Sequence, residues 1–597
     1  MEPTAGTSDP HAEYMQRLVR VKREQAVFVD HHKRLGTAKL VVIFGVLVLA
    51  WAIKYHGLSM YWLFLPVIAF VVLEIIHNKV FRSLRRFSRV VAFYEHGLAR
   101  LENRWMGMGE SGDGFLVASH PYARDLDLFG KASLFQLLCT ARTGTGQHIL
   151  ADWLLYPASA EEIKNRQGAV RELRTKLDLR EDMAVFGEDL RSTVHPKALT
   201  SWAEAPAVLK PRPLQIAAAI LAICWILSMI AWAVWGVWEV AVASSIVNAI
   251  FNARFKSRVQ QIVPAERFSP DFELLAGVLA RLEKETFSAV RLTALQGTLK
   301  QSGVNPSIAL GKIQSSLESL ESRRNLLVSG LDPFILWTAR MTFSVESWRQ
   351  EFGSAVPRWL NSVGEMEALM ALGGYTYEHP GDVFPEFCEQ GPFFDAEQFA
   401  HPLLPESQAI RNDLQMDSDM RLILISGPNM AGKSTFVRAV GTNAVLAQCG
   451  APVRARGLRM SRLQVAASIC ILDSLQGGVS HFYAEITRIK LIVELTKGAL
   501  PIMFLFDELL NGTNSHDRRI GAEAVVKSLV AKGGIGLVTT HDLALTQIVN
   551  DLAPKAANFH FEDHLENGEL RFDYRLTPGV AQSSNALKLM RSIGLEV

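Results

Sequence analysis

Two stretches of the chain are almost free of charge and far more apolar than their surroundings. The first consists of the runs Leu40–Ile53 and Leu58–Leu73, separated by the tetrapeptide KYHG. Each run falls short of the roughly 20 residues that a helix needs to cross a bilayer, but flanking lysines can reach the membrane surface. The pattern predicts a transmembrane helical hairpin over residues 38–77.

The second stretch runs from Leu214 to Phe251 and contains one charged residue, Glu239. It is too long for one membrane-spanning helix and long enough for two, with a turn near Trp235-Gly236. A helix pair on the surface of a soluble protein would show a polar stripe, which this stretch lacks. It predicts a second transmembrane hairpin over residues 211–252. Two hairpins buried in the core of a soluble protein are the alternative.

Basic residues stand on both sides of both stretches, in the segments RLVRVKRE, RSLRRFSR, LKPRP and NARFKSR. Because positive charge stays on the cytoplasmic side, all four flanks are expected in the cytosol, and each stretch crosses the bilayer an even number of times. The expected location is the inner (cytoplasmic) membrane, with the rest of the chain in the cytosol. Whether the passes number four or two stays open.

Outside the hairpins, apolar residues recur at helical spacing to about residue 375, and strand-like runs alternate with helical segments from there onward. This predicts a mostly helical region followed by an α/β domain. The predicted division is a basic cytosolic segment (1–37), hairpin 1 (38–77), a basic helical linker (78–115), a helical core in two parts (116–210 and 253–375) around hairpin 2 (211–252), and the α/β domain (376–597).

Charge and cysteine content add little to this picture. The chain has 62 Lys and Arg against 60 Asp and Glu, so its net charge does not indicate a class of partner. Its five cysteines are far apart and include no C-x-x-C pair, which disfavours a zinc site or a disulfide scaffold and fits a reducing compartment. The first residues lack the apolar core of a cleavable signal peptide.

The segment GPNMAGKS, residues 427–434, fits the pattern G-x-x-x-x-G-K-[ST] between an apolar strand and a helix. Its glycines allow backbone N–H groups to surround phosphate oxygens, and the helix adds its positive N-terminus. Lys433 would reach the β- and γ-phosphates, and Ser434 would bind Mg²⁺. The predicted site for ATP and Mg²⁺ comprises Gly427, Pro428, Asn429, Met430, Ala431, Gly432, Lys433, Ser434 and Thr435.

Two further strands end in residues suited to the same site. The apolar run Ile502–Phe506 is followed by Asp507 and Glu508, and adjacent buried carboxylates are costly without a cation. Asp507 is the predicted metal ligand, and Glu508 is expected to orient or activate the attacking water. The segment GIGLVTTHD ends near His541, which could hydrogen-bond the γ-phosphate; Glu508, His541 and Lys433 are the predicted catalytic residues.

Together these segments resemble the MutS family, the DNA mismatch-repair ATPases. GPNMAGKSTF resembles the family's phosphate loop, DELLNGTNSHD its D-E-x-x-x-G-T-S-x-x-D segment, and GVSHFYAE (478–485) its G-x-S-T-F-x-x-E loop, with His481 in place of threonine. The resemblance is strong over about 400–597 and moderate over about 120–195. It implies an ABC-like P-loop NTPase domain of α/β type, preceded by a MutS-type helical core. The hydrophobic pattern, and not the resemblance, predicts that this helical part carries two transmembrane helical hairpins.

The resemblance also implies a homodimer, in which Ser480 of one chain closes the γ-phosphate site of the other. ATP would close the dimer and hydrolysis would open it. The residues before about 115 show no likeness to the domain with which family members read mismatches. Phe93-Tyr94-Glu95 spells that domain's F-x-E motif but falls in a basic helix, where we interpret it as coincidence.

The expected function is therefore a membrane-anchored, ATP-driven dimeric clamp or switch that binds DNA, related by family to mismatch repair. One alternative is an ATP-switched membrane scaffold or signalling protein without nucleic acid. Besides the membrane, a second copy of the chain and DNA, other membrane or repair proteins are candidate partners. An ABC-type transporter is a third reading, disfavoured because short, nearly uncharged passes offer a poor substrate path. The basic segments RSLRRFSR and RLVRVKRE suit either phosphate contacts with DNA or anchoring to anionic lipid.

Overall fold

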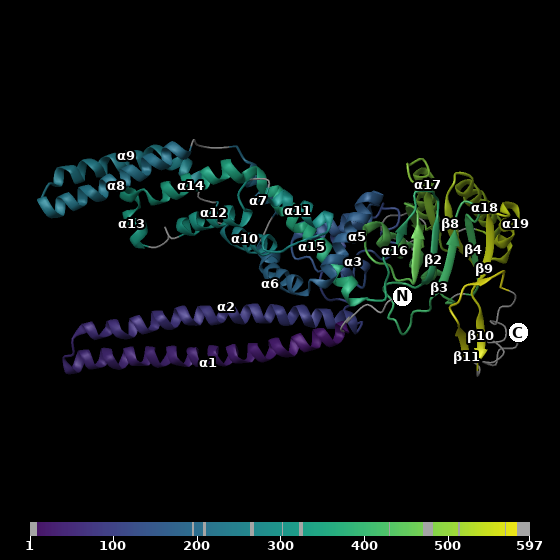
Figure 1. The fold of residues 1–597 in the computed structure, drawn as a ribbon, viewed down its shortest axis with the longest axis horizontal. Helices are drawn as coiled ribbons and strands as arrows, with labels where there is room; N and C mark the ends of the chain where they lie inside the picture. Colours follow the sequence, from purple (N-terminus) through teal and green to yellow (C-terminus); the bar gives the residue numbers. More distant parts are fainter. Residues whose placement is uncertain are drawn as a thin grey trace. The chain divides into compact units, whose positions relative to one another are not determined.

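The computed structural model describes residues 9–193, 196–206, 211–262, 265, 268–300, 303–321, 326–428, 430–469, 481–510, 514–566 and 569–581. The chain divides into two compact units (Figure 1). The first comprises Met1–Trp105 with Leu177–Ser192, and the second comprises Met106–Lys176 with Thr193–Val597. The first unit is therefore discontinuous in sequence, a feature that the hydrophobic pattern does not reveal.

A long antiparallel helical hairpin forms most of the first unit. Helix α1 (Pro10–His56) begins where the Asp9 side chain accepts a hydrogen bond from the His11 amide, and it ends at Gly57 in the left-handed conformation. The short helix η1 (Met60–Leu63) leads into α2 (Phe64–Leu101). At 1.5 Å per residue, the 47 residues of α1 extend for about 70 Å, far beyond the apolar run alone.

The apolar half of this hairpin is exposed. Large apolar side chains face outward along both helices, among them Leu40, Phe44, Leu47, Trp51, Tyr61, Leu65, Ile68 and Ile75. Within the described ranges, three helical stretches are long and apolar enough to cross a bilayer: Pro10–His56, Met60–Leu101 and Arg212–Trp235. Helix α9 (Trp238–Ile262), the second half of the predicted hairpin 2, is not among them.

Helix α6 (Leu177–Thr193) completes the first unit by binding the polar half of the hairpin. Arg17 of α1 forms an ion pair with Asp178, and the buried Tyr94 of α2 donates its hydroxyl hydrogen to Glu181. Tyr94 belongs to the Phe93-Tyr94-Glu95 segment and packs edge-on against Tyr14 at a centroid distance of 5.6 Å. The F-x-E sequence thus serves packing within the hairpin.

The basic run RSLRRFSR of α2 also contacts α6. Arg89 donates a hydrogen bond of 3.0 Å to the Val185 carbonyl oxygen, and Arg86 lies 3.5 Å from Asp182. Two arginines of this run therefore have partners inside the unit. The sequence suggested contacts with DNA phosphates or with anionic lipid for this run, and did not suggest these contacts within the unit.

The helical part of the second unit contains a second antiparallel hairpin, α8 (Pro211–Trp235) and α9, with its turn at Gly236 as the sequence predicts. Ser228 and Ser244 share a hydrogen bond of 2.7 Å between the two helices. Asn248 of α9 donates to the Phe334 carbonyl oxygen at 2.5 Å, which joins the hairpin to the short helix α13 (Leu326–Ile335).

Helix α15 (Val356–Glu378) is buried along most of its length. Its Glu367 carboxylate accepts hydrogen bonds from the Thr143 hydroxyl and from the Thr143 amide at 3.1 Å, at the start of α4. The other helices of this region are η2 (Asp113–Phe115), α3 (Leu134–Leu138), α4 (Gly144–Leu155), α5 (Ala160–Thr175), α7 (Pro196–Glu204), α10 (Ser269–Glu283), α11 (Val290–Lys300), α12 (Pro306–Glu321), α14 (Trp337–Phe352) and η5 (Gly353–Ala355).

The C-terminal α/β part is built on a six-stranded sheet in the order β12-β9-β4-β8-β7-β6. All neighbouring strands are parallel except the β12–β9 pair. Its strands are β4 (Leu422–Ser426), β6 (Gln464–Ser468), β7 (Ile502–Phe506), β8 (Ile535–Thr540), β9 (Ala556–His560) and β12 (Thr577–Pro578). Strands β4, β7 and β8 are buried throughout, which matches their continuous apolar runs.

Helices and smaller strands complete this domain. Its helices are α16 (Lys433–Cys449), α17 (His481–Leu495), α18 (Ser515–Ala531), η6 (Leu543–Gln547) and α19 (Ile548–Leu552). A second sheet has the order β1-β5-β2-β3, from Glu386–Phe387, Gly457–Met460, Phe394–Phe399 and Asn412–Met416, and β10 (Asp563–Glu566) pairs with β11 (Glu569–Phe572). The predicted order, a mostly helical region followed by an α/β domain, is confirmed.

Candidate functional site

The glycine-rich segment forms the connection between β4 and α16. Gly427 follows the strand with φ of 145°, and Gly432 precedes the helix with φ of 93°, a region that favours glycine. A Cβ at Gly427 would lie 2.8 Å from the Phe561 carbonyl oxygen, so the turn tolerates no side chain there. The predicted residue Asn429 lies outside the described residues.

Lys433 occupies the first position of α16 and is only 5% exposed. Its Nζ donates hydrogen bonds to the carbonyl oxygens of Gly427, at 2.8 Å, and Pro428, at 2.9 Å. Burial lowers the pKa of Lys433, while the negative charges of Glu508 and Asp507 act in the opposite direction. A buried ammonium group is therefore held inside the turn with two carboxylates close enough to influence it.

Those carboxylates follow β7, the second strand from β4 in the sheet order. The Asp507 amide donates to the Ser468 carbonyl oxygen at 3.0 Å, and the Thr539 hydroxyl donates to the Asp507 carboxylate. Glu508 has φ of 51°, and its amide donates to Thr539 Oγ1 at 3.1 Å. No sequence motif identifies Thr539, although its place at the end of β8 beside β7 indicates a position close to Asp507.

His541 follows β8, and its Nδ1 lies 3.3 Å from Glu508 Oε1. The fold thus brings Lys433, Asp507, Glu508 and His541 to the carboxyl ends of three parallel strands, β4, β7 and β8. Open α/β sheets place their ligands at this edge. Ser480, predicted to act from a second chain, lies outside the described residues.

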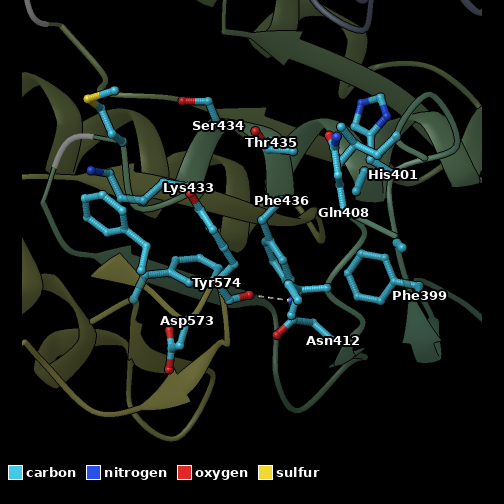
Figure 2. Close-up of a pocket in the computed structure, with 18 of the residues that line it drawn as sticks. Phe399, His401, Gln408, Asn412, Lys433, Ser434, Thr435, Phe436, Asp573 and Tyr574 are labelled. Atoms are coloured by element: carbon cyan, nitrogen blue, oxygen red, sulfur yellow. Dashed lines mark hydrogen bonds between the residues drawn. The ribbon is translucent and has the colours of Figure 1, made fainter. Parts of the chain in front are cut away.

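A cavity of about 820 Å³ opens beside this edge. Of the predicted site residues, Met430, Gly432, Lys433, Ser434, Thr435 and Glu508 line it; Gly427, Pro428, Ala431, Asp507 and His541 are described but are not among its lining residues. Figure 2 shows Lys433 and Tyr574 at one side of the cavity and Phe399 and His401 at the other. Besides Lys433, Ser434 and Thr435, the pocket is lined by aromatic residues, here called its aromatic side: Phe399, Phe436, Phe561, Phe572 and Tyr574.

The aromatic side was missed by sequence reasoning. Phe399 of β2 packs against Phe436 of α16 at a centroid distance of 5.3 Å, and Phe436 packs against Phe561 at 5.7 Å. Asn412 Nδ2 donates to the Tyr574 carbonyl oxygen at 3.0 Å, which joins β3 to the segment after β11 (Figure 2). These residues come from separate segments and form no contiguous motif, so no local pattern identifies them.

The residues present fit a magnesium ion bound together with phosphates. Mg²⁺ keeps several waters and is held by one or two carboxylates plus substrate phosphates. The Asp507 carboxylate and the Ser434 hydroxyl are groups of this kind, and they are the predicted ligands. Among the described residues, no group of three or more His, Cys, Asp or Glu side chains could hold a metal ion alone, as a dedicated transition-metal site would require.

Comparison with known proteins finds relatives of the C-terminal part of the chain, which holds the site. Residues 423–596 match the family model of MutS domain V. Endonuclease MutS2 of Thermus thermophilus is 31% identical over 248 residues, covering 40% of this chain and 31% of that protein. DNA mismatch repair protein MutS of Lactobacillus delbrueckii is 35% identical over 201 residues, covering 33% of this chain and 23% of that protein.

A third relative, DNA mismatch repair protein msh3 of Aspergillus oryzae, is 28% identical over 292 residues, or 47% of this chain and 25% of its own length. The matched regions span less than a third of each of these relatives. The glycine-rich turn, Lys433, Asp507, Glu508 and His541 all lie within the matched residues 423–596. Through this domain, the chain belongs to the MutS family.

Proposed function

We propose that the chain is a membrane-anchored ATPase of the MutS family, which hydrolyses ATP with Mg²⁺ and uses the cycle as a conformational switch. The observation that carries this proposal is the burial of Lys433 in a glycine turn after β4, with Asp507, Glu508 and His541 at the ends of the neighbouring strands. The match to MutS domain V over the same residues supports it.

Each side chain has a distinct role in this proposal. Backbone N–H groups of the 427–432 turn and Lys433 bind the phosphates, while the aromatic side of the cavity accepts the base. Ser434 and Asp507 would hold Mg²⁺, which would neutralise charge on the phosphates. Glu508 orients the attacking water and accepts its proton, and His541 holds the Glu508 carboxylate in position. Positioning and charge neutralisation of this kind are the main requirements of phosphoryl transfer.

The working unit proposed is a homodimer formed through the C-terminal domains. Support comes from the resemblance of residues 478–485 to the family loop that completes a partner's site. In this arrangement Ser480 of each chain contributes to the ATP site of the other. ATP binding then draws the two domains together, and hydrolysis releases them.

Anchoring in the inner membrane is proposed from the exposed apolar surfaces. The spans in Pro10–His56 and Met60–Leu101 have none of their most apolar residues buried, and that in Arg212–Trp235 has few. Such continuous apolar surface is too extensive for a soluble monomer but suits a bilayer. Helix α9 pairs with α8 and would cross beside it, which gives four passes with the ATPase domain in the cytosol.

DNA is the proposed macromolecular ligand, because two of the relatives are named for DNA mismatch repair and one is named an endonuclease. An ATP-switched scaffold without nucleic acid would bind DNA no better with ATP than without it. The deciding assay measures DNA binding by the detergent-solubilised dimer over a salt series, with and without ATP. Salt-dependent binding that changes with ATP supports the clamp; no binding at low salt overturns the DNA assignment.

The ATPase assignment is tested separately. Purified full-length protein should release phosphate from ATP only when Mg²⁺ is present, and Lys433→Ala should abolish both ATP binding and turnover. Arg421→Ala, a change at a half-buried arginine before β4 whose side chain donates to the Ser418 and Val530 carbonyl oxygens, serves as a control that should retain both. Mg²⁺-independent turnover, or full activity in Lys433→Ala, would contradict the proposal.

A further inference from the structure

Asp125 is a buried carboxylate outside the predicted site. Its hydrogen bonds connect it to a strand and a helix that in turn contact the site. Its side chain is 1% exposed. One oxygen, Oδ1, accepts a hydrogen bond of 2.7 Å from the Ile469 amide, at the end of β6. The other, Oδ2, accepts from Arg488 Nη2 of α17 at 3.1 Å. One carboxylate therefore joins a strand end to a helix.

The segment around Asp125, residues 120–127, reinforces both of these contacts. The Pro121 carbonyl oxygen accepts from the Ala467 amide at 2.9 Å, and the His120 carbonyl oxygen accepts from Arg488 Nη1 at 2.5 Å. Burying a charged pair is costly unless its geometry is good and its other polar groups are satisfied. Here Arg488 and Asp125 meet several partners, so the pair is held in one arrangement.

Both contacts of Asp125 continue to the turn that carries the predicted catalytic carboxylates, residues 507–510. Ser468 precedes Ile469, and its carbonyl oxygen accepts from the Asp507 amide at 3.0 Å. Along α17, Glu485 lies three residues before Arg488, on the same face of the helix. Glu485 Oε1 accepts from the Leu510 amide at 2.5 Å.

The 507–510 turn needs such support because its backbone is unusual. Glu508 and Leu510 have φ of 51° and 58°, in the left-handed region that side-chain-bearing residues rarely adopt. This conformation is strained for such residues and persists only where surrounding contacts hold it. The hydrogen bonds at Asp507 and Leu510 hold the two ends of this turn. The first is made by β6 and the second by α17, and Asp125 binds both of these elements.

We propose that Asp125 is a positioning residue for ATP hydrolysis, which fixes the 507–510 turn from both ends through β6 and α17 of its own chain. This inference rests on the proposed ATPase function. It predicts that loss of the Asp125 charge leaves the phosphate-binding turn intact, because residues 427–433 receive none of these contacts. The defect should then fall on turnover and spare ATP binding.

The test compares Asp125→Asn with Asp127→Asn in full-length protein. Asparagine at 125 keeps an acceptor for the Ile469 amide but loses the ion pair with Arg488. Asp127 is exposed, pairs with Arg438 at 3.2 Å and has φ of 50°, which asparagine tolerates. We expect kcat to fall about tenfold or more in Asp125→Asn, with the Kd for ATP within about twofold of wild type, and Asp127→Asn to keep both.

A purely structural role is separated by combining variants. In a Glu508→Gln background, Asp125→Asn should cause little further loss of the residual turnover, because the group that it positions is already disabled. An equal fold-loss in both backgrounds overturns the proposal, as does a rise in Kd that matches the fall in kcat, or an unchanged kcat. If Asp125→Asn does not fold, Arg488→Lys replaces it in the test. Lysine keeps the positive charge but cannot contact both the His120 carbonyl oxygen and Asp125, so kcat must fall while the Kd for ATP is unchanged.

The outcomes also separate this inference from the function on which it rests. A wild-type protein without ATPase activity overturns both. An active wild type with an equally active, folded Asp125→Asn variant overturns only the positioning role.

Discussion

His541 and Glu508 meet at the ends of adjacent parallel strands, with Nδ1 of the imidazole 3.3 Å from Oε1 of the carboxylate. The strands fix the spacing of the two residues, because β7 and β8 are paired in register immediately before them. The contact orients a carboxylate that the backbone alone presents in a strained conformation. It gives the proposed general base a defined direction, and this leads to the first prediction.

Glu508→Gln should bind ATP as wild type does but hydrolyse it roughly 10²–10⁴-fold more slowly, since the water loses its proton acceptor while Asp507 and Lys433 remain. Single-turnover phosphate release and fluorescent-nucleotide binding measure the two effects separately. Glu494→Gln, at an exposed position of α17, is the matched control and should be active. Near-normal turnover in Glu508→Gln would remove Glu508 from this role.

Gly427→Ala should weaken ATP binding by roughly tenfold or more. The added methyl group would lie 2.8 Å from the Phe561 carbonyl oxygen, so the turn must move away from the phosphates. Gly457→Ala in β5 is the control, because its methyl group meets nothing closer than 3.5 Å. Equal ATP affinities for the two variants, measured by titration, would show that the 427–432 turn does not contact the nucleotide.

Stability should fall as the pH is lowered, in part through His401. Burial, aided by the charges of Arg438 and Arg454, lowers the pKa of this imidazole from 6.5 to about 4. The unfolded chain therefore binds a proton between these values that the folded chain does not, so the contribution is full above about pH 6.5 and is lost towards pH 4. The loss is about 3 kcal/mol at most.

The measurement is the thermal unfolding midpoint of detergent-solubilised protein between pH 7.5 and pH 5. His401→Asn retains an acceptor for the Leu403 amide, which His401 Nδ1 binds at 3.2 Å, and removes the titrating group. This variant should lose less stability on acidification than wild type does. An identical pH dependence in both proteins would exclude His401 as a source of the effect.

The hairpins should hold the chain in the membrane without the ATPase domain. A fragment ending at residue 260 should resist carbonate extraction, whereas residues 376–597 alone should be released. In a background without the native cysteines, Ser59→Cys in the α1–α2 turn should react with an impermeant reagent outside intact cells, and Ser315→Cys on α12 should not. Labelling of Ser315→Cys, or protection of Ser59→Cys, would contradict the proposed topology.

Ser480 should act across the dimer. Lys433→Ala and Ser480→Arg chains should each be inactive alone, because every site lacks one of its two halves. When mixed, about half of the dimers would hold one intact site, so roughly a quarter of wild-type turnover should return, or less if the sites are coupled. No recovery, when mixed dimers form and a single intact site is known to turn over, would show that Ser480 does not act in trans.

Local patterns were sufficient for the polar side of the site. Lys433 lies within one contiguous motif, and Asp507, Glu508 and His541 follow buried strands whose ends share one edge of the sheet, so strand recognition alone places them together. Phe399, His401, Asn412 and Tyr574 could not be placed in this way. They lie in segments more than 150 residues apart at the extremes, and only the fold brings them to the same cavity.

The helical hairpin shows the same limit. Its turn after His56 follows from the polar interruption and Gly57, and the turn at Gly236 follows from a glycine between apolar runs. The attachment of α6 depends on the ion pair between Arg17 and Asp178. The sequence around either residue does not show that the two come together. Long-range pairs of this kind leave no periodicity for a single sequence to display.

The discontinuity of the first unit has a consequence for how the protein is made. Helices α1 and α2 leave the ribosome before residues 102–176, and α6 follows only after these. At about 5–20 residues per second, the delay is roughly 4–15 s. During this interval Arg17 has neither Asp178 nor Glu181 available, and Tyr94 lacks its carboxylate acceptor. In the proposed membrane topology, the hairpin would therefore enter the lipid as an unfinished domain, and a segment translated later would complete it from the cytosolic side.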